Sequence, residues 1–279
     1  MLTLWPACVR SHSLYDQITA AASTGFSAIA INSAGYVAAR SSGMTASRIR
    51  ETLHDCGMTV SWVDAVTGWL PVRFPPRSPE LKGFLDHELD IAFEIAAELG
   101  AEGLLAIGSF DHGAVDRSRQ IDCFGQLCER AAGNDLRVGL EPIPFWGIPT
   151  LRAALEIVDT VGAPNGGLML DSWHFYRGDP DIALLERVPG EKIFGVQLAD
   201  AEWEVRGDLQ QDCLEHRLLP GDGDFPLDAF MSRLVRMGVR DFGPEVFSAR
   251  LDALSAEEAA QRSAQAVRAV LIKHGVEAA

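Results

Sequence analysis

Two acidic side chains stand at the ends of consecutive apolar runs in this chain. Residues 138–141 (VGLE) end in Glu141, residues 168–171 (LMLD) end in Asp171, and His174 follows three residues later. A carboxylate at the end of a buried strand is costly unless another group pairs with it. Two of them in consecutive strand–helix units suggest a shared partner, and a divalent cation is the simplest one.

The next two apolar runs end in further oxygen-bearing side chains. Gln197 lies in residues 193–199 (IFGVQLA) and Glu245 in residues 241–246 (DFGPEV). Three carboxylates at one mouth cannot all stay ionised unless a cation compensates them. A shell of three carboxylates and one amide oxygen suits Mg²⁺ or Mn²⁺ better than a thiolate-rich zinc site does. We therefore expect Glu141, Asp171, Gln197 and Glu245 to hold a divalent metal.

Each of these four residues also has a purely structural interpretation. Glu141 could cap the loop that follows it, and Asp171 could cap a helix or pair with an arginine. Gln197 could be an ordinary polar residue inside a barrel, and Glu245 could pair with Arg217 or Arg250. These alternatives are not independent, because a single strand register would bring all four side chains together.

Five other residues are candidates for contacts with a substrate. His174, beside the expected metal, could act as acid or base or bind a substrate oxygen. Arg217 lies in a tight glycine-rich loop and could hold a substrate hydroxyl or enolate. Trp62 and Trp146 could form an aromatic wall for a sugar-like ring, and Asp64 lies near the end of the third expected strand. A packed histidine, a solvated arginine and core tryptophans are the alternatives.

The elements that position these residues alternate along the chain. The apolar runs predict strands at 2–8, 28–32, 59–65, 103–108, 138–141, 167–171, 193–199 and 241–246. Helical periodicity and capping residues predict helices at 13–24, 45–56, 79–99, 115–133, 150–161, 180–187, 226–237 and 256–274. The proline-rich stretch 68–79 and the polar stretch 200–223 are expected to be irregular.

Eight strand–helix units with no linker between them predict one (β/α)8 barrel, a TIM barrel, over residues 1–279. Its strands are almost continuously apolar, as strands buried on both faces should be. Active sites of such barrels lie at the carboxyl ends of the strands, where the four expected ligands fall. A doubly wound sheet is the alternative, but no GxGxxG motif follows the first expected strand.

The composition excludes several classes of partner. The formal net charge is -15 and the pI about 4.8, which argues against binding to nucleic acid or to an anionic membrane surface. Five cysteines without a CxxC pair are expected to be reduced thiols of a cytoplasmic protein. We expect no signal peptide and no membrane span, because no apolar run approaches ~18 residues.

Five short segments carry a family resemblance: LEP with Glu141, LMLDSWHFYR with Asp171 and His174, VQLAD with Gln197, RLLPGDGDFPL with Arg217, and GPEVFS with Glu245. Each segment alone is weak evidence for a family, but their order and their placement at strand ends together make the resemblance fairly specific. Over most of its length the chain resembles the xylose isomerase-like TIM-barrel superfamily, the sugar phosphate isomerase/epimerase group.

The resemblance implies an enzyme that binds a divalent metal, Mn²⁺ or Mg²⁺ with Co²⁺ or Zn²⁺ as further options. Glu141 and Glu245 would move a proton on a small keto-sugar or cyclic keto-polyol through an enediolate, as an isomerase or epimerase does. His174 and Arg217 would contact substrate oxygens. A small-molecule substrate is the only expected partner, and a homodimer is the default oligomeric state.

One position departs from the resemblance. Many epimerases have histidine on the seventh strand, where this chain has Gln197. Glutamine also occurs there in relatives that look like 3-dehydroshikimate dehydratase, so a dehydratase (a lyase) acting on a cyclic keto-acid is the second hypothesis. A binding or partner subunit without turnover is the third, and two candidate bases argue against it. Whether the substrate is phosphorylated stays open, although no glycine-rich phosphate loop is recognisable.

Overall fold

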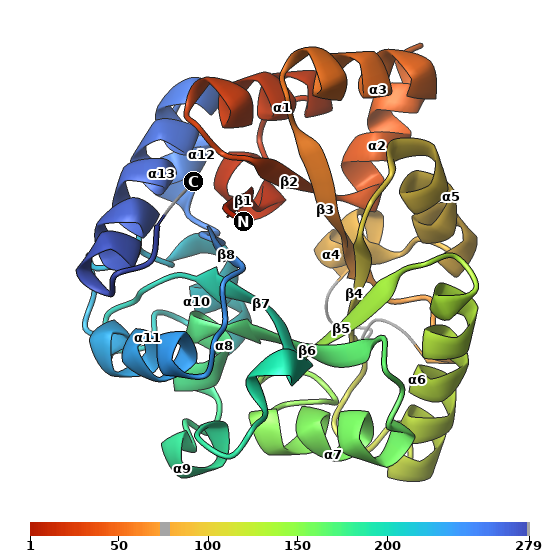
Figure 1. The fold of residues 1–279 in the computed structure, drawn as a ribbon, viewed down its shortest axis with the longest axis vertical. Coiled ribbons are helices and arrows are strands. Elements are labelled where there is room, and N and C mark those ends of the chain that lie inside the picture. The colour runs from red at the N-terminus through yellow and green to blue at the C-terminus, as the bar shows by residue number, and fades with distance from the viewer. Residues whose placement is uncertain (73–78, 278–279) are drawn as a thin grey trace.

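A computed structural model describes residues 1–72 and 79–277. Eight parallel strands form one sheet in the order β1 to β8, and helices surround it (Figure 1). The ends of the sheet meet, since Leu2 bridges Phe242 in parallel and the Phe242 amide donates to the Met1 carbonyl at 3.2 Å. The (β/α)8 prediction is therefore confirmed, and the doubly wound alternative is wrong.

The strands are β1 (Thr3–Leu4), β2 (Ala28–Ile31), β3 (Thr59–Val66), β4 (Gly103–Ile107), β5 (Arg137–Glu141), β6 (Gly166–Asp171), β7 (Ile193–Leu198) and β8 (Phe242–Pro244). The longer helices are α1 (Leu14–Ser23), α2 (Ser33–Ser41), α3 (Ala46–Asp55), α5 (Leu89–Leu99), α6 (Arg117–Ala132), α7 (Leu151–Val161), α11 (Leu227–Arg236) and α13 (Ala256–Lys273). Shorter helices are α4 (Pro79–Leu85), α8 (Ser172–Arg177), α9 (Ile182–Leu185), α10 (Leu209–Glu215) and α12 (Ala249–Asp252).

Side chains that point inward fill the barrel. The Trp62 ring lies 2.4 Å from where a Cβ on Gly103 would be, and the corresponding distance for Gly139 is 3.5 Å. Met169 fills the neighbouring space against Gly195. Glycines on adjacent strands thus make room for one tryptophan and one methionine, as close packing of a barrel interior requires.

Capping side chains mark several helix starts that the sequence predicts. Ser13, Thr45 and Thr150 accept hydrogen bonds from backbone amides in the first turns of α1, α3 and α7. Ser255 and Glu258 form a complete capping box at the start of α13. These helix starts follow from local hydrogen bonding alone, which explains why the sequence predicts them well.

Two predicted elements are wrong in extent. The strand expected at 2–8 ends at Leu4, because the chain turns into a 3₁₀ helix at Pro6–Val9. The helix expected at 79–99 is two helices, α4 and α5. The Thr67 hydroxyl donates to the Leu85 carbonyl at 2.9 Å, and a Cβ on Gly68 would lie 2.7 Å from the Leu89 amide nitrogen. The end of β3 therefore packs where a continuous helix would have to pass.

Four α-helices have no counterpart in the sequence prediction. They are α2, α8, α10 and α12. The stretch 200–223, expected to be a loop, contains α10, and His174 lies on α8 rather than in a loop. The irregular stretch expected at 68–79 falls partly outside the described residues.

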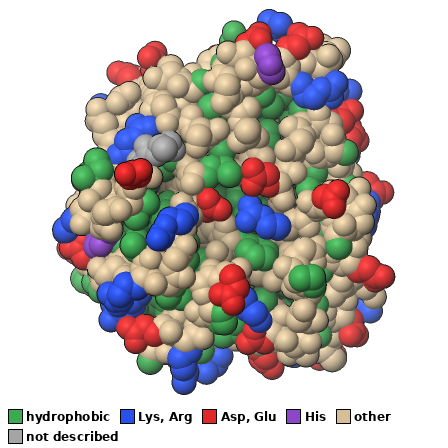
Figure 2. All heavy atoms as spheres, in the orientation of Figure 1, with side chains coloured by type: hydrophobic (Ala, Val, Ile, Leu, Met, Phe, Trp, Pro, Cys, Tyr) green, Lys and Arg blue, Asp and Glu red, His purple; other side chains and the backbone are tan. Residues whose placement is uncertain are grey.

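The surface carries charges of both signs. On the face in Figure 2, acidic and basic side chains lie among one another, with no separate basic patch. All five cysteines are free thiols, as predicted. None of the helices in residues 1–72 and 79–277 combines the length and apolar character needed to cross a membrane.

Candidate active site

The four predicted ligand residues meet at the carboxyl ends of adjacent strands. Glu141 ends β5, Asp171 ends β6, Gln197 is the next-to-last residue of β7, and Glu245 directly follows β8. Asp171 and Gln197 are partners in the β6–β7 register. All four side chains are buried. The strand register thus produces the grouping that the sequence predicts.

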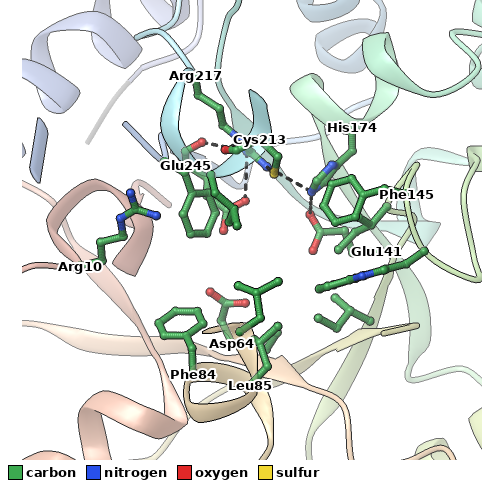
Figure 3. Close-up of a pocket in the computed structure, with 17 residues that line it drawn as sticks. Arg10, Asp64, Phe84, Leu85, Glu141, Phe145, His174, Cys213, Arg217 and Glu245 are labelled. Carbon is green, nitrogen blue, oxygen red and sulfur yellow. Dashed lines mark hydrogen bonds and ion pairs between the residues drawn. The ribbon is translucent and has the colours of Figure 1, made fainter. Parts of the chain in front are cut away.

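Arg217 lies within this group, and its side chain is fully buried. Its Nη1 donates to Asp171 Oδ2 at 2.8 Å and to the Glu245 carbonyl at 3.1 Å, and lies 3.5 Å from Glu245 Oε2. Its Nη2 lies 3.2 Å from His174 Nε2 (Figure 3). The ion pair of Glu245 with Arg217, one of the structural alternatives, is therefore present, and the solvated-charge alternative for Arg217 is wrong.

The guanidinium of Arg217 is held from behind by groups that the sequence does not indicate. Nε donates to the Cys213 carbonyl at 3.2 Å, and Nη2 contacts the Cys213 sulfur at 3.0 Å. The rings of Trp173 and Phe247 each have their centroid 5.1 Å from the guanidinium carbon. The sequence predicts an irregular stretch where α10 forms, so it does not indicate that Cys213 lies beside Arg217.

His174 connects the metal-ligand candidates on β5 and β6. Its backbone amide donates to Asp171 Oδ1 at 2.8 Å, which makes Asp171 the cap of α8, and its Nε2 lies 3.6 Å from Glu141 Oε1. Burial lowers the pKa of His174 to about 3. The ring is therefore neutral at physiological pH and able to both accept and donate one hydrogen bond.

The three carboxyl groups differ in their electrostatics. Burial, followed by the charges of Asp171 and Asp64, raises the pKa of Glu141 well above its usual value. Burial and the neighbouring Glu141 do the same to the pKa of Glu245. Burial would also raise the pKa of Asp171, but Arg217, His174 and Glu245 together outweigh it, and the pKa is lowered. Neighbouring groups thus outweigh burial at Asp171, whereas burial dominates at Glu141 and Glu245.

Several buried polar atoms in this group have no hydrogen-bond partner. They include Glu141 Oε1, His174 Nδ1, and both amide atoms of Gln197. Leaving such atoms unpaired costs roughly 1–3 kcal/mol each. In addition, Glu141, Asp171 and His174 offer ligand atoms that all lie within 4.8 Å of one another. Glu245 is outside this group of three. Two glutamates, one aspartate and an amide oxygen form an oxygen-rich donor set of the kind that a divalent cation binds.

A cavity of about 150 Å³ opens onto this group. Asp64, Trp146, Glu141, His174, Arg217 and Glu245 line it, so the structure places these predicted residues around one space. Trp62 is not among the described residues that line the cavity, because it packs inside the barrel. The walls are largely apolar, with Leu81, Phe84 and Leu85 from α4 and with Phe145 and Phe247 from strand-end loops.

Arg10 also lines this cavity, and the sequence analysis did not single it out. It follows the 3₁₀ helix that comes directly after β1. Its position just beyond a strand end was a usable signal. The partner that fixes its side chain, Asp252, is 242 residues away and could not be predicted locally.

Comparison with known proteins gives one family and several relatives. The family model described as "Xylose isomerase-like TIM barrel" matches residues 18–270. A 3-dehydroshikimate dehydratase of Pseudomonas aeruginosa is 37% identical over 166 residues, which are 56% of this chain and 25% of that protein. An inosose isomerase of Bacillus subtilis is 33% identical over 161 residues, 57% of each chain. The matches thus span less than two thirds of these relatives.

A solved structure, that of the IolI protein with a bound zinc atom, has a very similar fold. The TM-score is 0.83, the identity is 23%, and 98% of each chain is covered. At this identity the likeness establishes the fold alone. The same barrel therefore extends over nearly the whole chain.

Proposed function

This chain belongs to the xylose isomerase-like TIM-barrel family, and on that basis we propose that it is a divalent-metal-dependent enzyme. It would act on a small keto-sugar, cyclic keto-polyol or cyclic keto-acid through an enediolate. Isomerisation or epimerisation is the first candidate reaction. The observation that carries the proposal is that Glu141 and His174, two buried donors with unpaired atoms, line one cavity together with Glu245.

The proposed ligands are Glu141, Asp171, Gln197 and Glu245, with His174 close enough to complete or replace one of them. A bound divalent cation would polarise a substrate carbonyl and make the adjacent C–H more acidic. Mn²⁺ or Mg²⁺ suits the oxygen-rich donor set, whereas the relative IolI contains zinc. A divalent ion and the Arg217 guanidinium together would balance the charge of the three carboxylates.

Glu141 and Glu245 are the proposed proton-transfer groups. They flank the cavity from two sides, with Glu245 beside Arg217 and Glu141 beside His174 (Figure 3). Their raised pKa values bring proton exchange closer to neutral pH, where a general acid or base is most effective. One glutamate would take the proton from the carbon next to the carbonyl. The other would return a proton at a different carbon or on the opposite face.

The neutral His174, whose Nδ1 has no partner, would hold a substrate oxygen during this transfer, and the cationic Arg217, whose donors are paired within the protein, would keep His174 and Asp171 in place. His174 and Arg217 both point into the cavity between the two glutamates (Figure 3). Trp146 and Asp64 would contact the remainder of the substrate. The Leu81 and Phe84 side chains would exclude water from the reacting atoms, which strengthens the electrostatic interactions there.

A dehydratase of the 3-dehydroshikimate type is the second candidate. Gln197 favours it, because an amide binds metal but cannot exchange a proton as histidine can. In this reaction the proton leaves the carbon next to the carbonyl, and the β-hydroxyl leaves with a second proton as water. A relative named 3-dehydroshikimate dehydratase supports this candidate, and a relative named inosose isomerase supports the first.

Glu141→Gln and Glu245→Gln test the proton-transfer roles. Each should lower kcat by about 10²- to 10⁴-fold in the substrate conversion, because general acid–base catalysis contributes that much. Deuterium exchange from solvent, followed with inosose and with 3-dehydroshikimate, separates the two reactions. Exchange without water loss indicates an isomerase, and water loss indicates a dehydratase.

The half-exposed Glu102, which pairs with Arg137 at the start of β5, gives the matched control. Glu102→Gln should leave turnover unchanged. Full activity of both Glu141→Gln and Glu245→Gln would contradict the proton-transfer roles.

Metal removal tests the cofactor. Chelator-treated protein should lose turnover, and added Mn²⁺ or Mg²⁺ should restore it. Calorimetry should show one ion bound per chain, and Asp171→Asn should weaken that binding. If the metal-free protein turned over substrate as fast as the metal-loaded protein, the cofactor assignment would be wrong.

A further inference from the structure

We propose that Arg10 binds a carboxylate group of the substrate and thereby selects a cyclic keto-acid over an uncharged keto-polyol. This inference rests on the proposed function, since it names the substrate class of the same site. It begins from the position of Arg10 on the cavity wall opposite Glu141 and His174 (Figure 3). The reacting carbonyl and a distant carboxylate could therefore be held at two ends of one ligand.

Arg10 is held rigidly by groups outside the cavity. Asp252, on α12, accepts from Nε at 3.0 Å and from Nη2 at 2.5 Å, a two-point contact along one edge of the guanidinium. Ser11 donates to the same carboxylate at 3.1 Å. Because one edge is fixed in this way, the other edge with Nη1 stays available for a ligand, and little side-chain freedom would be lost on binding.

The ring of Phe247 contacts both Arg10 and Arg217. The Phe247 centroid lies 5.3 Å from the guanidinium carbon of Arg10 and 5.1 Å from that of Arg217. The same ring thus contacts both arginines, and both arginines line the cavity. A planar guanidinium binds a carboxylate with two parallel hydrogen bonds, which gives geometric selectivity as well as affinity.

Charge balance separates the roles of the two arginines. Arg217 is fully buried and its donors are used by Asp171, the Glu245 carbonyl and Cys213. The Arg10 side chain keeps 24% of its surface exposed. Among the described residues that line the cavity, Arg10 is the cation with donors left for a ligand. Asp64, an acidic residue that also lines the cavity, has its pKa raised by burial to about 7 and so repels an anion less.

Equilibrium binding of 3-dehydroshikimate and of its methyl ester tests the proposal, because the ester lacks the carboxylate charge and adds only one methyl group. Calorimetry with metal-free and with Mn²⁺-loaded protein should show tighter binding of the acid in both. Arg10→Gln should remove about 10- to 100-fold of affinity for the acid, as expected for a charged hydrogen-bond partner, and little for the ester. Arg10→Lys should keep part of the preference.

Arg130 gives a matched control. It also pairs with an aspartate, Asp90 at 2.6 Å, and stacks on a phenylalanine, Phe93, but it does not line the cavity. Arg130→Gln should leave both affinities unchanged. If wild-type protein binds acid and ester equally, or if Arg10→Gln keeps the full preference, the proposal is wrong.

The same measurements separate this proposal from the proposed function. Turnover of neutral inosose without binding of the keto-acid would overturn the role of Arg10 and leave the enzyme assignment intact. An acid preference that depends on Arg10, in a protein that turns over no ketone, would support Arg10 and overturn the enzyme assignment. Thermal unfolding of each variant shows whether it is folded, and the acid–ester comparison in wild type needs no variant.

Discussion

At the scale of single residues, Arg217 divides three neighbouring carboxyl groups into two kinds. It contacts Asp171 directly and lowers the pKa of that group despite burial. In the part of the chain that the structure describes, Glu141 forms no hydrogen bond or ion pair with Arg217, and burial raises its pKa. Asp171 is therefore suited to hold a cation as an anion at any physiological pH. Glu141 and Glu245 are suited to gain and lose a proton.

This division predicts how stability depends on pH in the metal-free protein. Glu141 and Glu245 have folded-state pKa values above the unfolded value of about 4.3. At pH values above about 4.3 the folded state therefore binds more protons than the unfolded state does. Their contribution to stability is therefore present below about pH 4.3 and is lost as pH rises through the raised values. Chemical unfolding between pH 5 and 8 should show this decline, and saturating Mn²⁺ should oppose it.

Glu141→Gln combined with Glu245→Gln is the control for that measurement, because an amide does not titrate. The double variant should show a flatter dependence of unfolding free energy on pH. A decline of the same slope in this variant would assign the effect to other groups, such as Asp64 with its pKa of about 7.

Residue types at strand ends were enough to predict most of the site. Glu141, Asp171, Gln197 and Glu245 all follow apolar runs, and parallel strands bring their carboxyl ends together. Arg10 was missed because a distant residue fixes it. Trp62 was expected at the cavity, but its position in the middle of β3 directs it into the barrel packing.

At the scale of elements, one buried aspartate organises the segment that carries Arg217. Asp200 accepts hydrogen bonds from the backbone amides of Ala201, Gly221 and Phe225, at 2.8, 3.1 and 3.0 Å. Its own backbone exchanges two hydrogen bonds with Leu218, the residue after Arg217. A single carboxylate thus connects the end of β7 to the glycine-rich turn and fixes the backbone beside Arg217.

Asp200→Asn should therefore affect both stability and catalysis. The amide nitrogen would face backbone donors, which costs about 1–3 kcal/mol, and Arg217 would be less firmly placed. We expect a lower unfolding free energy together with a reduced kcat/KM. Ser255→Ala removes the cap of α13 and should cost about 1 kcal/mol without changing kcat/KM. Equal activity of the two variants would show that Asp200 supports the fold alone.

Element boundaries were predictable where local hydrogen bonds set them, and not where tertiary contacts do. The caps of α1, α3 and α7 are local. The interruption between α4 and α5 depends on Thr67 at the end of β3. Helix α8 depends on Asp171, which the sequence analysis assigned to metal binding and which serves as a cap as well.

At the scale of the whole molecule, barrel closure is what brings Glu245 to Glu141. Alternation of strands and helices predicts eight units, but it does not show that the first and last strands pair. In the structure Leu2 bridges Phe242, and the N-terminal amine lies 3.2 Å from Asp241. The positions of Glu245 and of the segment from β1 to Arg10 therefore depend on the same contact between the first and last strands.

Gly243, in β8, lies at this contact between the first and last strands, and a substitution there tests whether barrel closure positions Glu245. A Cβ there would lie 2.1 Å from the Thr3 carbonyl oxygen and 2.8 Å from Trp5 Nε1, so Gly243→Ala must push backbone apart. Overpacking of this kind costs about 1–3 kcal/mol or more. Because Glu245 follows two residues later, kcat/KM should fall as well, at temperatures where the variant is still folded.

Gly35, in α2, is the matched control, since an added Cβ would meet no described atom within 4 Å. Gly35→Ala should be neutral or stabilising by up to about 1 kcal/mol, because alanine restricts the unfolded chain. Thermal unfolding and kinetics measured on both variants would decide the point. If Gly243→Ala lost stability but kept full kcat/KM in the folded protein, closure of the barrel would stabilise the fold without placing Glu245 for catalysis.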